Sequence, residues 1–138
     1  MFPQRYVGDV LVDNLLCIPF ADDITIAIAP GICNSSESIY VRRVVYHAQF
    51  QGYRVSVLNH VGALKCVPVT SPRIFTVGNT DDYDAMVKDL LKRYPNTKIV
   101  CLGFSMGGNL VTKYLGERAH GPEIVAGVSA CQGYDAMK

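Results

Sequence analysis

Residues 97–114 read TKIVCLGFSMGGNLVTKY, and this stretch constrains the fold more than any other part of the 138-residue chain. Its first half is a short apolar run with β-branched residues, which is typical of a buried strand. Its second half carries apolar residues at helical spacing. The two halves meet in a G-x-S-x-G sequence whose central residue is Ser105. The stretch therefore predicts a strand, a sharp turn and a helix, with Ser105 at the turn.

This context gives Ser105 a possible chemical role. A serine at such a turn has a strained backbone and an exposed hydroxyl at the carboxyl end of the strand. Gly103 and Gly107 leave room for the strand and the helix to pass closely. The N–H of Met106 would face a developing oxyanion, helped by the helix N-terminus. We therefore predict a catalytic nucleophile at Ser105; the alternative is a glycine-rich turn with an ordinary serine.

The rest of the chain alternates predicted strands and helices. This alternation indicates an α/β fold, with a mostly parallel sheet and helices on both faces. Ligands of such sheets bind at the carboxyl ends of the strands, where Pro30-Gly31, Asn59-His60 and Ser105 fall. The predicted strands are residues 23–29, 53–58, 99–102 and 124–129, and the predicted helices end near Gln51, Tyr94 and Leu115.

Each predicted helix has its own boundary signals. Ser35 or Ser36 is expected to cap the first helix, whose apolar face is predicted to contain Ile39, Val44, Val45 and Ala48. Asp81 or Asp82 starts the second, and apolar residues at i, i+3, i+4 and i+7 follow from Tyr83. Gly116 is expected to end the third. Residues 59–80 show no periodicity and are predicted to be a loop that shapes a pocket.

Composition excludes several classes of function. The net charge is +1, with lysines and arginines scattered along the chain, so we expect no nucleic-acid surface. The five cysteines form no C-x-x-C pair, and the glycines form no dinucleotide-binding motif, so we expect neither a metal site nor a cofactor. No apolar run approaches 18 residues, and the N-terminus lacks the form of a signal peptide.

Longer stretches carry a family resemblance. The sequences AIAPGICNSSESIYVRRVVYHAQFQGYRVSVLNHVGA, TSPRIFT and LGFSMGGNLVTKYLGE resemble the α/β-hydrolase-domain lipases of the acylglycerol-lipase and YheT-like (embryogenesis-associated) group. The resemblance covers residue 23 to the C-terminus. It implies a membrane-associated serine hydrolase that cleaves monoacylglycerols and short-chain esters through an acyl-enzyme on Ser105. It also implies a small-molecule lipid ester as substrate, no cofactor, and a steroid as a possible regulator.

The resemblance also assigns parts of the site. Many hydrolases have His-Gly where this chain has Pro30-Gly31, so we place the second oxyanion donor at the Ile32 N–H, with Gly31 allowing the tight turn. Residues 1–22 show no match and stay unassigned. Residues 23–138 are expected to be the N-terminal part of an α/β-hydrolase domain that includes the nucleophile elbow. The family's catalytic acid and histidine lie further along, so a partial α/β-hydrolase fold is expected.

No histidine of the chain is well placed as the catalytic base. His120 follows Ser105 by 15 residues, mostly along a helix, which puts it roughly 20 Å away. His60 ends a strand on the same edge, roughly 10 Å from Ser105 if one strand intervenes, and is expected to support the Pro30-Gly31 loop. His47 is expected to be structural and Asp135 to lie on the surface.

Two readings of the function therefore stay open. One is an active serine hydrolase. The other is a catalytically inactive fragment, or a module that binds lipid, steroid or a partner chain. An acyltransferase is disfavoured because the H-x-x-x-x-D motif of some relatives is absent. We also expect the last strand to be an exposed apolar edge, so that the isolated chain folds poorly and has little esterase activity.

Overall fold

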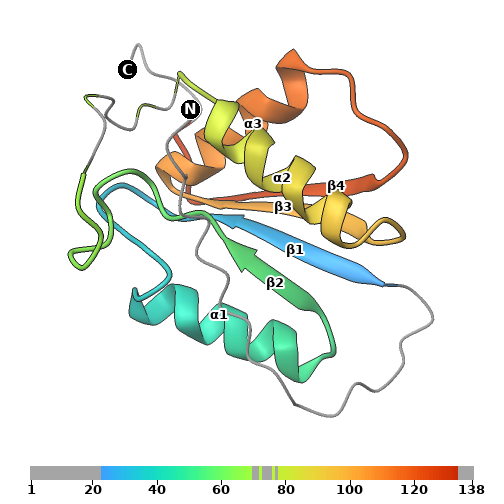
Figure 1. The fold of residues 1–138 in the computed structure, drawn as a ribbon, viewed down its shortest axis with the longest axis horizontal. Coiled ribbons are helices and arrows are strands. Elements are labelled where there is room, and N and C mark those ends of the chain that lie inside the picture. Colours follow the sequence, from blue (N-terminus) through green and yellow to red (C-terminus); the bar gives the residue numbers. More distant parts are fainter. Residues whose placement is uncertain (1–22, 70–71, 73–75, 77, 134–138) are drawn as a thin grey trace.

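The computed structural model describes residues 23–69, 72, 76 and 78–133, and over these residues it contains four strands and three helices (Figure 1). All strand pairs are parallel, and the order across the sheet is β2-β1-β3-β4. The predicted α/β fold is therefore confirmed. The elements are β1 (Ile24–Ala29), α1 (Ile39–Phe50), β2 (Arg54–Val57), α2 (Asp81–Arg93), β3 (Lys98–Phe104), α3 (Met106–Glu117) and β4 (Ile124–Ala130).

The sheet is covered on both faces. Helix α1 packs on one face, and helices α2 and α3 pack on the other (Figure 1). Strand β1 contributes to both apolar cores, because Ile28 points toward α1 while Ala27 and Ala29 belong to the core under α2 and α3. All three side chains are fully buried. Removal of this apolar surface from water is the main stabilising term of such a fold.

Helix α2 follows the predicted amphipathic pattern. Its buried side chains are Tyr83, Met86, Val87 and Leu90. Acidic residues occupy its first turn and basic residues its last, which suits the helix dipole. Periodicity was sufficient here because the buried side chains recur at helical spacing on one face from Tyr83 to Leu90.

The first helix differs from the prediction at its start. It begins at Ile39, with Ser38 at the N-cap position, whereas a cap at Ser35 or Ser36 was expected. The earlier serines form turns instead: the Ser35 hydroxyl oxygen accepts a hydrogen bond from the Glu37 N–H at 3.2 Å. Serine hydroxyls stabilise turns as readily as helix caps.

Two further predictions about helices were wrong. Ile39 is 74% exposed, and Val41 is buried in its place. At 3.6 residues per turn, Ile39 lies about 240° around the helix from the buried Val45, so it cannot share that face. Gly116 lies inside α3, which continues to Glu117; the Glu117 carboxylate pairs with Lys113 one turn earlier.

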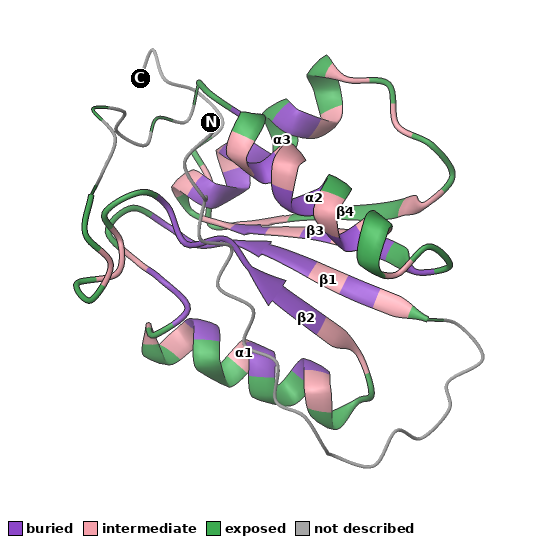
Figure 2. Cartoon of the chain, viewed as in Figure 1, coloured by how far each residue is buried: buried purple, intermediate pink, exposed green. Residues whose placement is uncertain are grey.

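Burial falls across the sheet on the α1 side. A register-matched row of apolar side chains runs from Val57 through Ile28 and Leu102 to Val128. Val57 and Ile28 are buried, Leu102 is half-buried and Val128 is 46% exposed. Figure 2 shows the same trend from β1 to β4. Among the described strands, β4 is the exposed apolar edge strand that the sequence predicted.

Some predictions fall on positions outside the described residues. These are the unassigned segment 1–22 and Asp135. Within the described part of the chain, no helix combines the length and apolar character needed to cross a bilayer.

Candidate active site

Ser105 occupies the single residue between β3 and α3. Its backbone angles are φ 51° and ψ −122°, and the residue is exposed. A residue with a side chain adopts this region at a cost of about 1–3 kcal/mol, so its surroundings must hold it there. The Ser105 N–H donates to the Ala130 carbonyl at 2.8 Å, and the Ser105 carbonyl accepts from the Gly108 N–H at 2.8 Å. These bonds present the hydroxyl at the carboxyl edge of the sheet.

The flanking glycines allow three backbone segments to meet under Ser105. A Cβ on Gly103 would lie 2.2 Å from the Gly107 carbonyl oxygen. A Cβ on Gly107 would lie 2.1 Å from the Ala29 carbonyl oxygen. Any side chain at either position would therefore drive α3 away from β3 or β1.

The loop after β1 packs directly against Ser105. Gly31 is buried, and a Cβ built on it would lie 3.3 Å from the Ser105 Cβ. Ile32 comes next and is 59% exposed, and its carbonyl accepts a hydrogen bond from the Asn34 side chain at 2.8 Å. Met106 is the first residue of α3, where backbone N–H groups lack partners inside the helix. Of the two residues expected to supply oxyanion donors, Met106 directly follows Ser105, and Ile32 directly follows Gly31, which packs against Ser105.

Two side chains hold this loop: Tyr40, which the sequence did not single out, and Asn59, which the sequence placed only at the same edge of the sheet. The Gly31 N–H donates to the Tyr40 hydroxyl at 3.1 Å, and the Tyr40 ring meets Phe104 edge-on, with centroids 5.2 Å apart. The Asn59 side chain accepts from the Ser36 N–H at 2.8 Å. Neither contact leaves a periodic signal, because each joins a loop to a residue distant in the sequence.

None of the three histidines is hydrogen-bonded to the Ser105 hydroxyl. His60 follows β2 and is buried. Burial lowers its pKa, whereas interactions with the Pro30 backbone and the negative charge of Asp82 oppose that shift. His120 lies beyond the far end of α3, where its Nε2 is 3.1 Å from the Tyr114 carbonyl oxygen. His47 is exposed on α1.

The described residues contain no group of three histidine, cysteine or acidic side chains that could hold a metal ion. Cys101 is buried in β3, and burial raises its pKa, which keeps it a thiol. The described polar groups near the elbow include the Ser129 hydroxyl and the Gln132 amide, which lie beside Gly108, and the backbone N–H groups of the turn. Such groups suit nucleophilic chemistry on a neutral carbonyl compound.

Comparison with known proteins places this geometry in a family. The sequence matches the family described as the alpha/beta hydrolase fold over residues 24–136. The chain therefore belongs to the alpha/beta hydrolase fold family, as its resemblance indicated.

Its relatives include lipases and esterases. The chain is 56% identical over 119 residues to abhydrolase domain-containing protein 2 of Drosophila melanogaster and 52% identical over 118 residues to human monoacylglycerol lipase ABHD2. These alignments cover 85% of this chain but only 30% and 28% of the two relatives. The chain thus spans less than a third of the length of these curated relatives.

The fold also resembles solved hydrolase structures. An esterase from Pyrococcus furiosus, Pf2001, superimposes with a TM-score of 0.64 at 28% sequence identity, over 80% of this chain and 42% of the esterase. The described residues therefore form a partial α/β-hydrolase fold.

Proposed function

We propose that this chain carries the nucleophile of a serine hydrolase that cleaves monoacylglycerols and short-chain esters. The observation that carries the proposal is the strained, exposed position of Ser105 between β3 and α3. Similarity to a monoacylglycerol lipase and to an esterase supports a lipid ester as the substrate. The same resemblance extends the proposal to a membrane location and to a steroid as regulator.

In the proposed reaction, the Ser105 oxygen attacks the ester carbonyl carbon. The carbonyl oxygen becomes an oxyanion, which accepts hydrogen bonds from the N–H groups of Met106 and Ile32. The alcohol leaves with a proton, and the acyl group remains on Ser105 until water releases it as a carboxylic acid. Gly31 and Tyr40 serve this step by holding the loop that carries Ile32 against Ser105.

A second function is favoured by the positions of the histidines. The attack requires a base that removes the serine proton, and the members of such a triad act as a unit. Among the described residues, no hydrogen bond joins a histidine to the Ser105 hydroxyl. A module that binds a lipid, a steroid or a partner chain without turnover is therefore the alternative, and we expect this chain by itself to have little esterase activity.

A fluorophosphonate probe tests the two functions. The purified chain is treated with the probe beside Ser105→Ala and beside Ser129→Ala, which removes another hydroxyl near the same edge of the sheet. Labelling that is lost only in Ser105→Ala supports an activated serine, and His60→Gln then tests the first candidate base. A folded wild-type chain that resists the probe supports the binding module.

A further inference from the structure

The outward face of α1 is unusually apolar. Ile39, Tyr46 and Phe50 are 74%, 71% and 62% exposed, the largest values among the exposed large hydrophobic side chains of the described residues. With about 100° between successive residues, these three lie within about 40° of one another around the helix. The opposite side of α1 buries Val41, Val45 and Ala48. Helix α1 therefore presents apolar side chains to both the sheet and the solvent.

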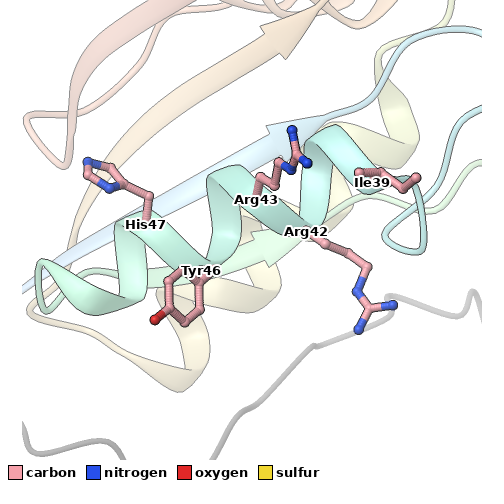
Figure 3. Close-up of a pocket in the computed structure, with 5 residues that line it drawn as sticks. All are labelled: Ile39, Arg42, Arg43, Tyr46 and His47. Carbon is pink, nitrogen blue, oxygen red and sulfur yellow. The ribbon is translucent and has the colours of Figure 1, made fainter.

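Basic side chains flank this apolar strip. Arg42 and Arg43 project to different sides of the helix, with Ile39 and Tyr46 beside them (Figure 3). These residues and His47 line a shallow open pocket. We call the six side chains the α1 outer face: Ile39, Arg42, Arg43, Tyr46, His47 and Phe50.

The charge of the α1 outer face is not neutralised by its own helix. Helix α1 contains no acidic residue, and neither arginine forms an ion pair with a described residue. Helix α2 differs, because Lys88 pairs with Asp84 at 2.7 Å and Arg93 pairs with Asp89 at 2.6 Å. The exposed acid closest to α1 in sequence is Glu37, two residues before its start.

We propose that the α1 outer face docks on an anionic lipid bilayer. Aromatic and aliphatic side chains flanked by cations are the features of helices that lie in the membrane interface. Ile39, Tyr46 and Phe50 enter the boundary between headgroups and acyl chains, and the two arginines bind anionic headgroups. The aliphatic Ile39 at the start of the strip favours lipid over nucleic acid, whose bases stack on aromatic side chains.

The position of α1 also links this surface to Ser105. Tyr40, in the first turn of α1, accepts the hydrogen bond of Gly31, and Gly31 packs against Ser105. The helix that meets the bilayer is thus linked to the candidate nucleophile through Tyr40 and Gly31. The role of this surface rests on the proposed action on lipid esters, because docking would bring Ser105 to its substrate. The binding itself does not require a reaction at Ser105.

Vesicle co-sedimentation of the full 138-residue chain tests the proposal. The vesicles contain phosphatidylcholine alone or phosphatidylcholine with about 30% phosphatidylserine, at low and high salt. We expect binding to the anionic vesicles that weakens with salt. At about 1 kcal/mol per basic residue near an anionic surface, Arg42→Gln/Arg43→Gln should weaken partitioning by about 10- to 30-fold. Tyr46→Ser/Phe50→Ser should also weaken it.

Matched variants separate this surface from net charge and from catalysis. Lys88→Gln/Lys92→Gln removes the same charge from α2 and should bind as the wild type does. Ser105→Ala should also bind normally, so that a failure of the hydrolase proposal leaves this test intact. No binding to anionic vesicles, equal loss in the α2 variant, or stronger capture by single-stranded RNA than by vesicles would overturn the proposal.

Discussion

Strands β1 and β4 both pair with β3, yet they are stabilised differently. On the β1 side, Ile28 is fully buried beneath α1, whereas Val128 in the same row on the β4 side is 46% exposed. Helix α1 covers β2 and β1 and leaves the same face of β4 open (Figure 2). One neighbour of β3 is thus a core strand, and the other is an edge strand.

Both neighbours nevertheless help to position Ser105. The β1 side does so by close packing, because the Ala29 carbonyl fills the space beside Gly107. The β4 side does so by hydrogen bonding, because the Ala130 carbonyl accepts the Ser105 N–H. The segment after β4 is tied to α3 through Asn109, whose side chain donates to the Gly133 carbonyl at 2.7 Å. The position of Ser105 therefore depends on two neighbouring strands, the buried β1 and the more exposed β4.

The largest expected effect on stability comes from adding a side chain where α3 packs directly against β1. Gly107→Ala places a methyl group 2.1 Å from the Ala29 carbonyl, which is backbone of a buried strand and cannot move aside. We expect a loss of about 3 kcal/mol or more of unfolding free energy, measured by urea denaturation. Gly108→Ala, on the β4 side, meets the Ser129 hydroxyl at 2.4 Å, and that side chain can rotate away. It should cost about 1 kcal/mol.

Helix α3 supplies the control for this pair. A Cβ on Gly116 meets nothing within 4 Å, so Gly116→Ala should stabilise the chain by about 0.5–1 kcal/mol through helix propensity alone. Equal losses at Gly107 and Gly108 would show that the two sides of the helix are packed alike, contrary to the structure.

A second pair of variants compares the two strands directly. Ile28→Ala removes a fully buried side chain and should lower the unfolding free energy by about 3 kcal/mol. Val128→Ala, across Leu102 in the same row, should cost less than about 1 kcal/mol because its side chain is already half in water. Urea denaturation of both variants measures the difference, and similar losses would mean that β4 is covered in solution.

The loop after β2 contains a buried titratable group, His60. Because burial lowers the pKa of His60 in the folded chain, the unfolded chain binds more protons than the folded chain between that lowered pKa and about pH 6.5. The unfolding free energy should therefore fall as the pH drops below about 6.5, by at most about 1.4 kcal/mol per pH unit. Denaturation at pH 7.5 and pH 5 should show a smaller decrease in His60→Gln than in the wild type. His47→Gln, at an exposed position, serves as the control; an unchanged decrease in His60→Gln would refute the assignment.

The smallest effect on stability, though not on solubility, is expected at the edge strand. Val125→Lys/Val128→Lys places charges on a strand whose unpaired edge can pair with other chains. Light scattering should show less association at the same concentration, with the unfolding free energy changed by no more than about 0.5 kcal/mol. Val69→Lys tests charge alone, because Val69 is 60% exposed in the loop between β2 and α2. If that variant improves solubility equally, edge pairing is not the cause of association.

Local signals in the sequence predicted much of this molecule. The elbow around Ser105 could be predicted because its strand, turn and helix are contiguous, and α2 could be predicted because its buried side chains recur at helical spacing on one face. The start of α1 could not be predicted, since the five consecutive polar residues 34–38 compete to form turns and caps. The support of Gly31 by Tyr40 was missed because it depends on how a loop folds back onto a helix. The sequence did not identify a base for Ser105, and in the described part of the chain no histidine is hydrogen-bonded to its hydroxyl.

Cys101 is a natural probe of local opening in the core. Its thiol lies in β3, four residues before Ser105, and is buried, while Cys33, Cys66 and Cys131 are exposed. A thiol reagent should modify the exposed three quickly and reach Cys101 only when the core beneath α2 and α3 opens. The slow phase of alkylation would then measure the rate at which the core around β3 opens to expose Cys101, without any introduced label.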